Sequence, residues 1–326
     1  MQAAAVGRME GQRMDTVVAR HRLLQAIRGF FLERGYLEVE TPQLVRQAPP
    51  DPYIDPLEVH VGVEGPFFLH TSPEVGMKRL VARGYPAIFQ ICKVFRVEEL
   101  EEHHNVEFTM LEWYRRGTYL DAMTETAELI ARAVDALEPA DADYFRQPWP
   151  VHELGSLFRE RTGFDPVDLD GQALYTRMKE FGIQGISPEE PWEDLFFRLL
   201  VHELEGTLQD DSPYFIKDWP VAISTMAKRK DSGRVERFEL YMKELEIANG
   251  YTELLDPTEQ RSRFASDNAR RQRLGKRTMP VDESFLADLS CIKGSYTGVS
   301  VGVDRLLMVL LGKIRIGEVL PLRLTV

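Results

Sequence analysis

The sequence is poor in cysteine, and this excludes two kinds of protein. Its 326 residues contain two cysteines, Cys92 and Cys291, which are too far apart to form a C-x-x-C pair. A zinc site built on such pairs and a disulfide-dense secreted scaffold are therefore excluded. Because this cysteine usage is typical of a reducing compartment, we expect a cytoplasmic protein.

The chain also lacks any excess of positive charge. It has 40 Lys and Arg against 52 Asp and Glu, so its net charge is −12. An acidic protein is a poor general binder of polyanions, and we therefore do not expect tRNA as a partner. Two basic stretches, 228–230 and 270–273, are either solvated surface or a local docking patch.

Long apolar runs and the common glycine-rich nucleotide motifs are absent as well. No run approaches the roughly 20 residues of a membrane span, and residues 1–15 lack the apolar core of a signal peptide. Neither G-x-G-x-x-G after a predicted strand nor G-x-x-x-x-G-K-[ST] occurs. A dinucleotide-binding fold and a P-loop are therefore not indicated.

Hydrophobic periodicity predicts an α+β fold. Helices are predicted at 17–34, 72–83, 119–137, 258–274 and 305–311, the second with Ser72 as its N-cap. Strands are predicted at 36–40, 67–70, 88–97, 107–114, 221–224 and 297–303, and a hairpin at 238–251. Since most strands fall in hairpins, we expect an antiparallel sheet flanked by helices. We expect residues 1–16 to be a flexible lead-in to one domain over 17–326, with a mainly helical insertion at about 118–217.

Arg96 and Glu98 are the first candidates for chemistry. They are two residues apart on a predicted strand, so their side chains leave the same face of the sheet. The guanidinium fork of arginine suits a pair of phosphate oxygens, and a glutamate accepts a hydrogen bond from an exocyclic amine. The alternative is an ion pair on the surface, which is common.

Two glutamates of the predicted 238–251 hairpin form the second candidate site. If 243–244 is a two-residue turn, Tyr241 faces Glu246, and Glu239 lies diagonally from Glu246 at roughly 7 Å. Carboxylates at this spacing repel each other unless a cation lies between them, and Mg²⁺ carrying substrate phosphates would serve. The alternative is a solvated acidic hairpin.

The third candidate is the segment that joins the strand at 297–303 to the following helix. Gly298, Ser300 and Gly302 share one face of this strand, and a face with almost no side chains lets a ligand approach the backbone. Arg305 then stands at the start of a helix, where phosphate binding is favoured. The alternative is a tightly packed corner between strand and helix.

A group of acids beside aromatic residues is the fourth candidate. Glu74, Glu112 and Glu253 lie next to apolar or aromatic neighbours, and Tyr114 is two residues from Glu112. A pocket with several carboxylates and an aromatic side chain would suit a diamine. Taken singly, these residues are more simply explained as ordinary surface acids.

In combination, these segments resemble the class II aminoacyl-tRNA synthetases. GYLEVETP at 35–42 resembles motif 1 of that family, FRVE at 95–98 with HNVEFT at 104–109 resembles motif 2, and GVDR at 302–305 resembles motif 3. TSPE at 71–74, EFTMLEWY at 107–114 and FELYMKELEIANGYTEL at 238–254 are close to the lysyl-tRNA synthetase branch. The match covers about 17–313 and implies the class II catalytic fold, in a homodimer formed through motif 1.

Two features indicate a particular group within this branch. The residues before the motif 1 helix are too few for the anticodon-binding OB domain of a bacterial lysyl-tRNA synthetase. IANG at 247–250 is also closer to the elongation factor P–lysine lysyltransferase group, a truncated paralog of those synthetases. That resemblance implies an AMP-forming ligase that activates (R)-β-lysine with ATP and transfers it to a lysine of elongation factor P.

The resemblance also implies a role for each candidate residue. Arg96 would hold the α-phosphate of ATP, Glu98 would contact the adenine amine, and Glu239 and Glu246 would hold Mg²⁺. Arg305 would hold the γ-phosphate and enclose the adenine together with Phe108. The other nucleotide contacts fall to His104, Asn105, Glu246, Ile247 and Gly302, and the lysine contacts to Ser72, Glu74, Glu112, Tyr114, Glu253 and Ser300.

Ser300 departs from both patterns. At this place, four residues before the aspartate of motif 3, lysyl-tRNA synthetases have glycine and the paralog has alanine. A side chain there narrows the amino-acid pocket, which favours β-lysine over α-lysine, but serine leaves this choice open. Two other interpretations also stay open: a compact enzyme that charges tRNA or another acceptor with α-lysine, and a non-catalytic, synthetase-like regulatory subunit.

Overall fold

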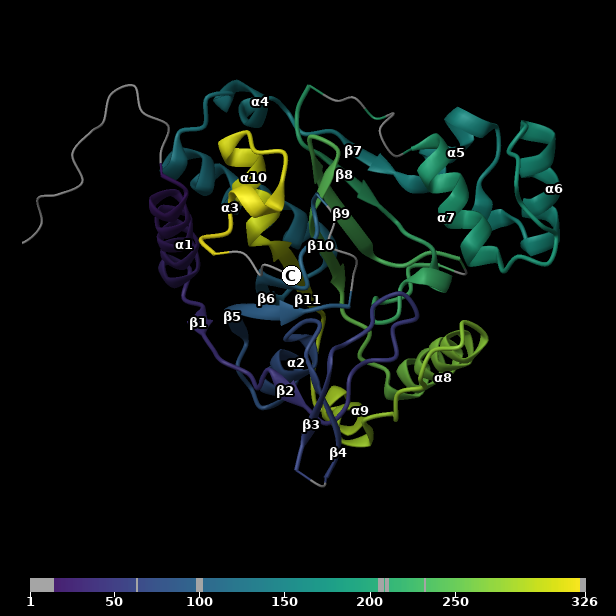
Figure 1. Cartoon of the computed structure of the whole chain (residues 1–326), viewed down its shortest axis with the longest axis horizontal. Helices are drawn as coiled ribbons and strands as arrows, with labels where there is room; N and C mark the ends of the chain where they lie inside the picture. The colour runs from purple at the N-terminus through teal and green to yellow at the C-terminus, as the bar shows by residue number, and fades with distance from the viewer. Residues whose placement is uncertain are drawn as a thin grey trace, which may run out of the picture.

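An eight-stranded sheet organises the described part of the chain, which comprises residues 15–62, 64–97, 102–204, 208, 211–231 and 233–322 of the computed structural model. Helices pack on this sheet, and a three-stranded sheet lies beside it (Figure 1). The helices are α1 (Thr16–Glu33), α2 (Glu74–Ala82), α3 (Tyr119–Leu137), α4 (Ala142–Arg146), α5 (Leu154–Thr162), α6 (Gly171–Phe181), α7 (Trp192–Glu203), α8 (Pro257–Arg273), α9 (Glu283–Leu289) and α10 (Val303–Leu311). The strands are β1 (Leu37–Glu38), β2 (Leu44–Val45), β3 (Glu58–Val61), β4 (Glu64–Leu69), β5 (Ala87–Phe95), β6 (Glu107–Arg116), β7 (Val151–Glu153), β8 (Tyr214–Lys217), β9 (Arg237–Met242), β10 (Leu245–Thr252) and β11 (Tyr296–Gly302). Within these described ranges, no helix is both long and apolar enough to cross a membrane.

The large sheet has the strand order β1-β5-β6-β11-β10-β9-β8-β7. Each neighbouring pair from β5 to β8 is antiparallel, whereas β1 joins β5, and β7 joins β8, in parallel. The β5–β6 pair is the hairpin predicted from 88–97 and 107–114. The predicted α+β fold, with an antiparallel sheet flanked by helices, is therefore confirmed.

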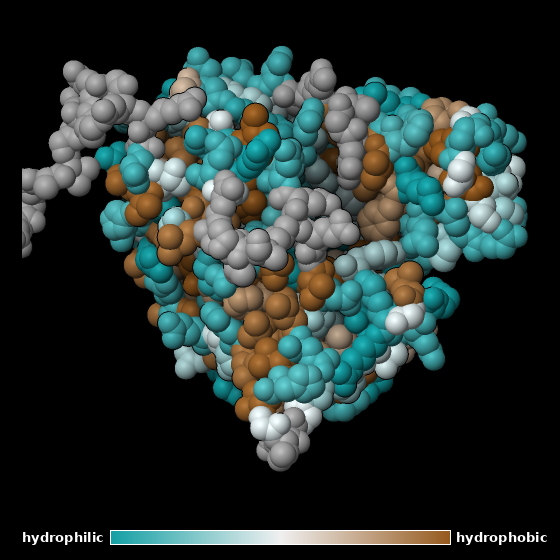
Figure 2. Space-filling view, viewed as in Figure 1, coloured by the Kyte–Doolittle hydropathy of each residue, from teal (hydrophilic) through white to brown (hydrophobic). Residues whose placement is uncertain are grey.

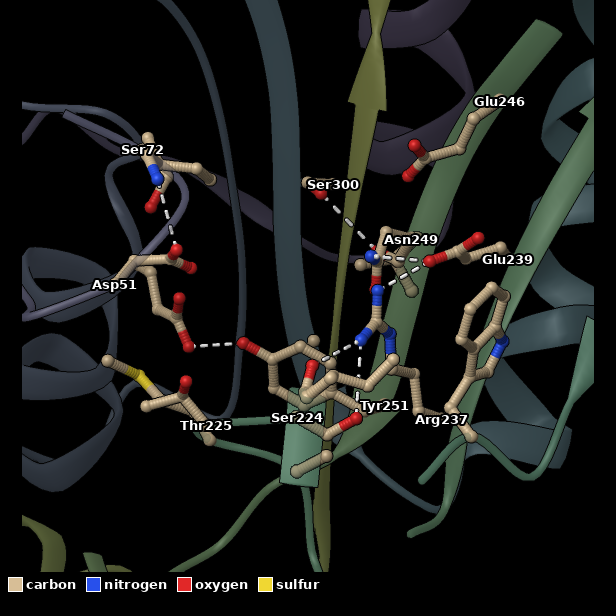
Figure 3. Close-up of a pocket in the computed structure, with 18 of the residues that line it drawn as sticks. Asp51, Ser72, Ser224, Thr225, Arg237, Glu239, Glu246, Asn249, Tyr251 and Ser300 are labelled. Carbon is tan, nitrogen blue, oxygen red and sulfur yellow. Dashed lines mark hydrogen bonds and ion pairs between the residues drawn. The ribbon is translucent and has the colours of Figure 1, made fainter. Parts of the chain in front are cut away.

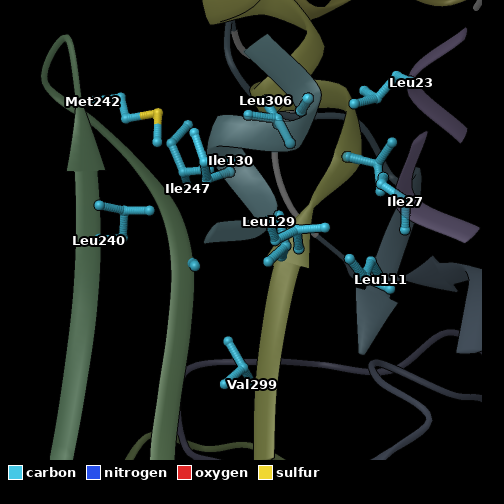
Figure 4. Close-up of a cluster of buried hydrophobic side chains, with 14 of the residues drawn as sticks. Leu23, Ile27, Leu111, Leu129, Ile130, Leu240, Met242, Ile247, Val299 and Leu306 are labelled. Atoms are coloured by element: carbon cyan, nitrogen blue, oxygen red, sulfur yellow. The ribbon is translucent and has the colours of Figure 1, made fainter. Parts of the chain in front are cut away.

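The main core lies between this sheet and helices α1, α3 and α10 (Figure 4). Its buried residues include Leu23, Ile27, Leu129, Ile130, Leu240 and Leu306. Because side chains alternate along a strand, Val299 and Val301 of β11 point into the core. Gly298, Ser300 and Gly302 consequently face the other side of the sheet, which is left free for a site.

Within the predicted insertion at about 118–217, α3 packs into the main core, whereas α5, α6 and α7 share a separate apolar cluster. Helices α5, α6 and α7 pack through residues that include Leu157, Phe158, Leu174, Leu195 and Phe196. The outer surface of this lobe is largely hydrophilic, as Figure 2 shows on its right side. Sequence reasoning missed that β7 and β8 of this segment join the edge of the large sheet, because such short strands show no clear period of two.

Two local predictions are wrong. Ser72 is not the N-cap of α2: the helix begins after Pro73, whose C=O accepts the first helical hydrogen bond from Met77 N. Residues 221–224 form a short 3₁₀ turn instead of a strand, since Ser224 N donates to Val221 O three residues before it.

The strand predicted at 88–97 ends early. β5 stops at Phe95, and Val97 N donates to Asp55 O, outside the hairpin. Arg96 therefore lies just beyond the strand, so the prediction that it stands within one is wrong. Glu98 lies outside the described residues.

The predicted two-residue turn at 243–244 is confirmed. Both residues have positive φ angles, 49° and 67°, as a type I′ turn requires. Tyr241 pairs with Glu246, as predicted, but a bulge follows Glu246 and brings Glu239 opposite Asn249. The turn and the bulge together set the place of both glutamates.

The two basic stretches pair with carboxylates of this chain. The ion pairs are Lys228–Glu236, Arg229–Glu259, Lys230–Asp218, Arg270–Glu193 and Arg271–Asp55. Charges engaged in this way are less available to a polyanion. The pairs favour the interpretation of both stretches as structural surface over that of a docking patch.

One buried carboxylate joins the main sheet to two helices. Asp304, in the first turn of α10, is 1% exposed. Its Oδ2 accepts a hydrogen bond from Thr109 N of β6 at 2.6 Å, and its Oδ1 pairs with Arg20 of α1. A buried carboxylate is costly without such partners. These contacts fix the start of α10 against β6, and with it the neighbouring Arg305.

We expect Arg20→Met to destabilise the protein by about 3 kcal/mol, because it leaves the buried charge of Asp304 without its cation. Urea unfolding of the variant and the wild type measures the change. Arg20→Met/Asp304→Asn is the control, and it should recover part of the loss since neither charge remains. A loss for Arg20→Met below about 0.5 kcal/mol, the usual range of a surface substitution, would contradict this role.

Candidate active site

Two adjoining cavities lie on the face of the large sheet that turns away from the main core. The first has a volume of about 400 Å³ and the second about 260 Å³. Arg96, Met110, Glu246, Asn249 and Ser300 line both cavities. Figure 3 shows the first cavity, with Ser300 and Asn249 between Ser72 on its left and Glu239 on its right. The two cavities differ in chemistry.

The second cavity brings together the residues predicted to contact a nucleotide. They are Arg96, His104, Asn105, Phe108, Glu246, Ile247, Gly302 and Arg305. They come from β6, β10, β11, α10 and the segment before β6, so the fold gathers motifs from distant parts of the chain. Glu98, which was predicted with them, is outside the described residues.

Two guanidinium groups line this second cavity. Arg305 Nη2 lies 2.6 Å from His104 Nε2. Arg96 Nε donates to Thr71 O at 3.3 Å, and the Arg96 guanidinium lies 5.2 Å from the centre of the Phe108 ring. Two positioned cations beside an aromatic ring suit a ligand that carries phosphate groups and a flat base.

Glu239 and Glu246 lie close enough to affect each other's charge. Burial of Glu239 and the charge of Glu246 raise the pKa of Glu239 to about 7. Arg237 Nη2 lies 2.5 Å from Glu239 Oε1, and Tyr241 OH donates to Oε2 at 2.7 Å. Among the described residues, no group of three or more His, Cys, Asp or Glu could hold a metal ion. A divalent cation at this pair would take further oxygen ligands, such as phosphate.

The first cavity ends in buried acids and phenols. Tyr114 OH donates to Glu112 Oε1 at 2.6 Å, and Tyr251 OH donates to Glu74 Oε1. Burial and the nearby charge of Glu74 raise the pKa of Glu112 to about 8. An incoming ammonium group would stabilise the charged form of such a carboxyl group. This end of the site therefore suits an amine.

Lys78 is a further charged residue at this end, and sequence reasoning missed it. Its side chain is buried, and Nζ lies 2.6 Å from Glu74 Oε1 and 2.5 Å from Glu253 Oε2. Burial lowers the pKa of Lys78, but the charges of Glu253 and Glu74 outweigh this effect and hold the pKa above its usual value. A signal was present, since Lys78 follows Glu74 by four residues on a predicted helix.

Glu253 lies directly behind the wall of the first cavity. Gly298 lines the wall at this point, and a Cβ built on Gly298 would lie 2.5 Å from Glu253 Oε1 and would also meet the Tyr114 ring. Burial raises the pKa of Glu253 to about 8. The absence of a side chain at Gly298 thus lets this carboxylate approach the cavity.

Ser72 and Ser300 also line the first cavity. Ser300 Oγ donates to Asn249 O at 3.3 Å, between the two cavities. Sequence reasoning missed the lining residues Asn249 and Tyr251. They were open to prediction, because a period of two along β10 places them on the face of Glu253.

Comparison with known protein families agrees with this arrangement. The family model of class II tRNA synthetases (D, K and N) matches residues 6–324. The chain belongs to this family.

Individual relatives narrow the comparison to one group. The chain is 37% identical over 318 residues to the elongation factor P–(R)-β-lysine ligase of Avibacterium paragallinarum, with 94% of each chain covered. It is 35% identical over 315 residues to the ligase of the same name from Klebsiella pneumoniae (strain 342), again with 94% of each covered. The predicted resemblance to the elongation factor P–lysine lysyltransferase group is therefore confirmed.

We expect Glu112→Gln to stabilise the ligand-free protein increasingly as the pH rises. The Glu112 pKa rises from its ordinary value of 4.5 to about 8 in the fold, so folding favours the protonated form. The contribution of Glu112 is then full below about pH 4.5 and is lost as the pH rises through about 8, whereas glutamine does not ionise. The measurement is the Tm difference between variant and wild type from about pH 5 to about pH 9.

Glu128→Gln, on the exposed face of α3, is the matched control and should show no such trend. A Tm difference for Glu112→Gln that stays constant with pH would show that burial does not hold this carboxyl in its neutral form.

Proposed function

We propose that this protein activates (R)-β-lysine with ATP as a lysyl-adenylate and transfers the lysyl group to a lysine side chain of elongation factor P. One observation carries the proposal: a cavity with two arginines adjoins a cavity that ends in carboxylates, and Ser300 lies between them. The relatives named elongation factor P–(R)-β-lysine ligase support the choice of substrates.

ATP would occupy the second cavity. Arg96 would hold its α-phosphate and Arg305 its γ-phosphate, and Phe108 with Arg305 would enclose the adenine, whose amine we assign to Glu98. The guanidinium groups would neutralise charge as it develops on the phosphates. Catalysis would then consist of positioning and electrostatic stabilisation, with no side chain as a covalent nucleophile.

Mg²⁺ fits the carboxylates of Glu239 and Glu246. Two carboxylates completed by phosphate oxygens are a usual magnesium site, and burial of Glu239 beside a second acid leaves it in need of a cation. Bound there, Mg²⁺ would neutralise phosphate charge. Arg237 already supplies part of this compensation at Glu239.

The substrate lysine would lie in the first cavity. Glu74, Glu112 and Tyr114 would receive its ammonium groups, which directs the carboxylate toward the second cavity. That carboxylate would attack the α-phosphorus of ATP, form the adenylate and release pyrophosphate. The amine of the acceptor lysine would then attack the adenylate carbonyl, form an amide and release AMP.

A homodimer formed through α1 and β1 is part of this proposal. Val17 and Leu32 of α1 and Leu37 of β1 are each more than half exposed, at 56%, 56% and 51%. Apolar side chains at such exposure are suited to an interface. The resemblance of 35–42 to motif 1 supports the same surface.

We expect Arg96→Ala to reduce ATP–pyrophosphate exchange by more than about 100-fold, because one of the two phosphate-binding cations is lost. Arg277→Ala is the control, since Arg277 is a surface residue paired with Glu58 and should keep wild-type exchange. Exchange at the wild-type rate in Arg96→Ala would rule out the assigned role of Arg96.

We expect Ser300→Gly to shift the preference toward α-lysine. Removing the Ser300 side chain widens the first cavity beside Asn249, which relieves the restriction on α-lysine more than on β-lysine. The ratio of kcat/KM for the two lysines in pyrophosphate exchange measures the shift, with Ser300→Ala as the control that keeps a side chain. An unchanged ratio would mean that another residue determines this choice.

The proposed function as a whole is tested by intact-protein mass spectrometry of elongation factor P after incubation with this protein, Mg-ATP and either lysine. A single lysyl adduct, larger with (R)-β-lysine and accompanied by no charging of tRNA, is the expected result. An adduct on tRNA alone would instead favour a compact synthetase. If neither adduct forms and no pyrophosphate exchange occurs, the result would favour a regulatory subunit.

A further inference from the structure

We propose that Lys78 is a positioning residue that ties Glu74 to Glu253 and sets the charge of the first cavity to match a substrate with two ammonium groups. This proposal rests on the proposed function. It explains how the first cavity would select a substrate with two amino groups. Lys78 does not itself line the cavity, and it acts through the two carboxylates that it holds.

Lys78 is placed as a fixed internal cation. It is 1% exposed, and its Nζ contacts a carboxylate from its own helix and one from the segment after β10. The Nζ also lies 3.6 Å from Met226 Sδ and 5.5 Å from the centre of the Tyr251 ring. A buried ammonium group is tolerated only with partners of this kind, and removing one partner leaves the other charge uncompensated.

The groups around Lys78 set the charge balance of this end of the site. The titratable groups that face it are the carboxyls of Glu74, Glu112 and Glu253 and the phenols of Tyr114 and Tyr251. When all the carboxyls are ionised, three negative charges and one ammonium group leave a net charge of −2. (R)-β-lysine carries two ammonium groups, so its binding would bring this end to neutrality.

The orientation of Glu253 supports this account. Lys78 contacts Oε2, while Oε1 points to the cavity wall at Gly298. Among the described residues, neither buried oxygen of Glu253 accepts a hydrogen bond of good geometry, and only Oε2 has a cation beside it, Lys78 Nζ at 2.5 Å. A buried acceptor without a partner is costly, and a substrate ammonium group at this wall would supply one. Lys78 thus holds Glu253 with one oxygen engaged and the other directed to the substrate.

Charge matching of this kind discriminates against monoamines. Norleucine has the chain length of lysine but lacks its terminal amine, so it would leave one buried carboxylate uncompensated. Norleucine would therefore lack the charge-assisted hydrogen bonds that the second ammonium group of lysine gains from that carboxylate. Without Lys78, three carboxyls lie together with no internal cation, so their mutual repulsion opposes ionisation, and the cavity loses part of its preference for the second ammonium group.

The test compares Lys78→Met with Lys78→Met/Glu253→Gln in ATP–pyrophosphate exchange with (R)-β-lysine, α-lysine and norleucine. Lys78→Met should raise the KM for lysine, and lower the preference for lysine over norleucine, by about tenfold or more. The double variant should recover part of the preference, because Glu253→Gln removes one of the three repelling carboxyls and leaves Glu74 and Glu112 to supply a charge of −2. Arg234→Met is the matched control, since the Arg234 side chain is 15% exposed, it pairs with buried Asp165, and neither residue lines either cavity. It should lower Tm without changing the preference.

Two results would overturn the proposal. One is a Lys78→Met variant with wild-type preference for lysine over norleucine. The other is a double variant with a preference no greater than that of Lys78→Met, which would mean that Lys78 does not act through Glu253.

Stability measurements on the ligand-free protein separate this proposal from the proposed function. Loss of the Lys78 ammonium raises the pKa of Glu253 further above its wild-type value of about 8, so the Tm deficit of Lys78→Met should grow as the pH rises above about 8. The double variant, which has no carboxyl at position 253, should show no such growth, and Arg234→Met should show none either. If the wild-type protein fails to activate any lysine but the Tm deficits of the variants depend on pH in this way, the proposed function fails and the charge role of Lys78 stands. A deficit that is independent of pH would reject that role.

Discussion

The alternation of side chains along β11 is the constraint on which the site depends. Val299 and Val301 are buried in the main core, and this burial forces Gly298, Ser300 and Gly302 onto the opposite face. Since β11 lies in the middle of the sheet, between β6 and β10, that face becomes the floor shared by both cavities. A slip of one residue in the register would exchange the two sets and would lose the core and the site together.

Burial of acidic groups in the site lowers the stability of the ligand-free protein. Glu112, Glu239 and Glu253 are buried, and burial raises the pKa of each carboxyl group. Internal cations offset part of this cost, Arg237 at one end and Lys78 at the other. The ligands that we propose, a metal-bound phosphate and an amine, would offset the rest of the cost of burying these carboxyl groups. The groups that weaken the empty fold are thus the ones that would give the substrate its binding free energy.

The features that sequence analysis predicted are those with local causes. The β9–β10 hairpin follows from its turn at 243–244, and the helix at 119–137 follows from its own periodicity, so both were predicted closely. Lys78 and the edge strands β7 and β8 were missed because their roles depend on partners distant in the sequence. Arg96 was assigned to a strand because the apolar pattern runs on to Val97; Arg96 N still donates to Val106 O across the hairpin, and only Val97 N turns to Asp55 O. The motifs predicted which residues line the second cavity, whereas their distances and hydrogen-bond partners are known only from the structure.

Part of the wall of the first cavity belongs to the apolar cluster of α5, α6 and α7. Phe197, Leu200 and Trp219 pack with the insertion's own apolar cluster, yet they also line the first cavity. Substitutions that repack α5, α6 and α7 can therefore reshape one wall of the cavity while the main core, and the floor on β11, keep their packing. The shape of the proposed lysine cavity can therefore change through this lobe without a change in the residues of the second cavity.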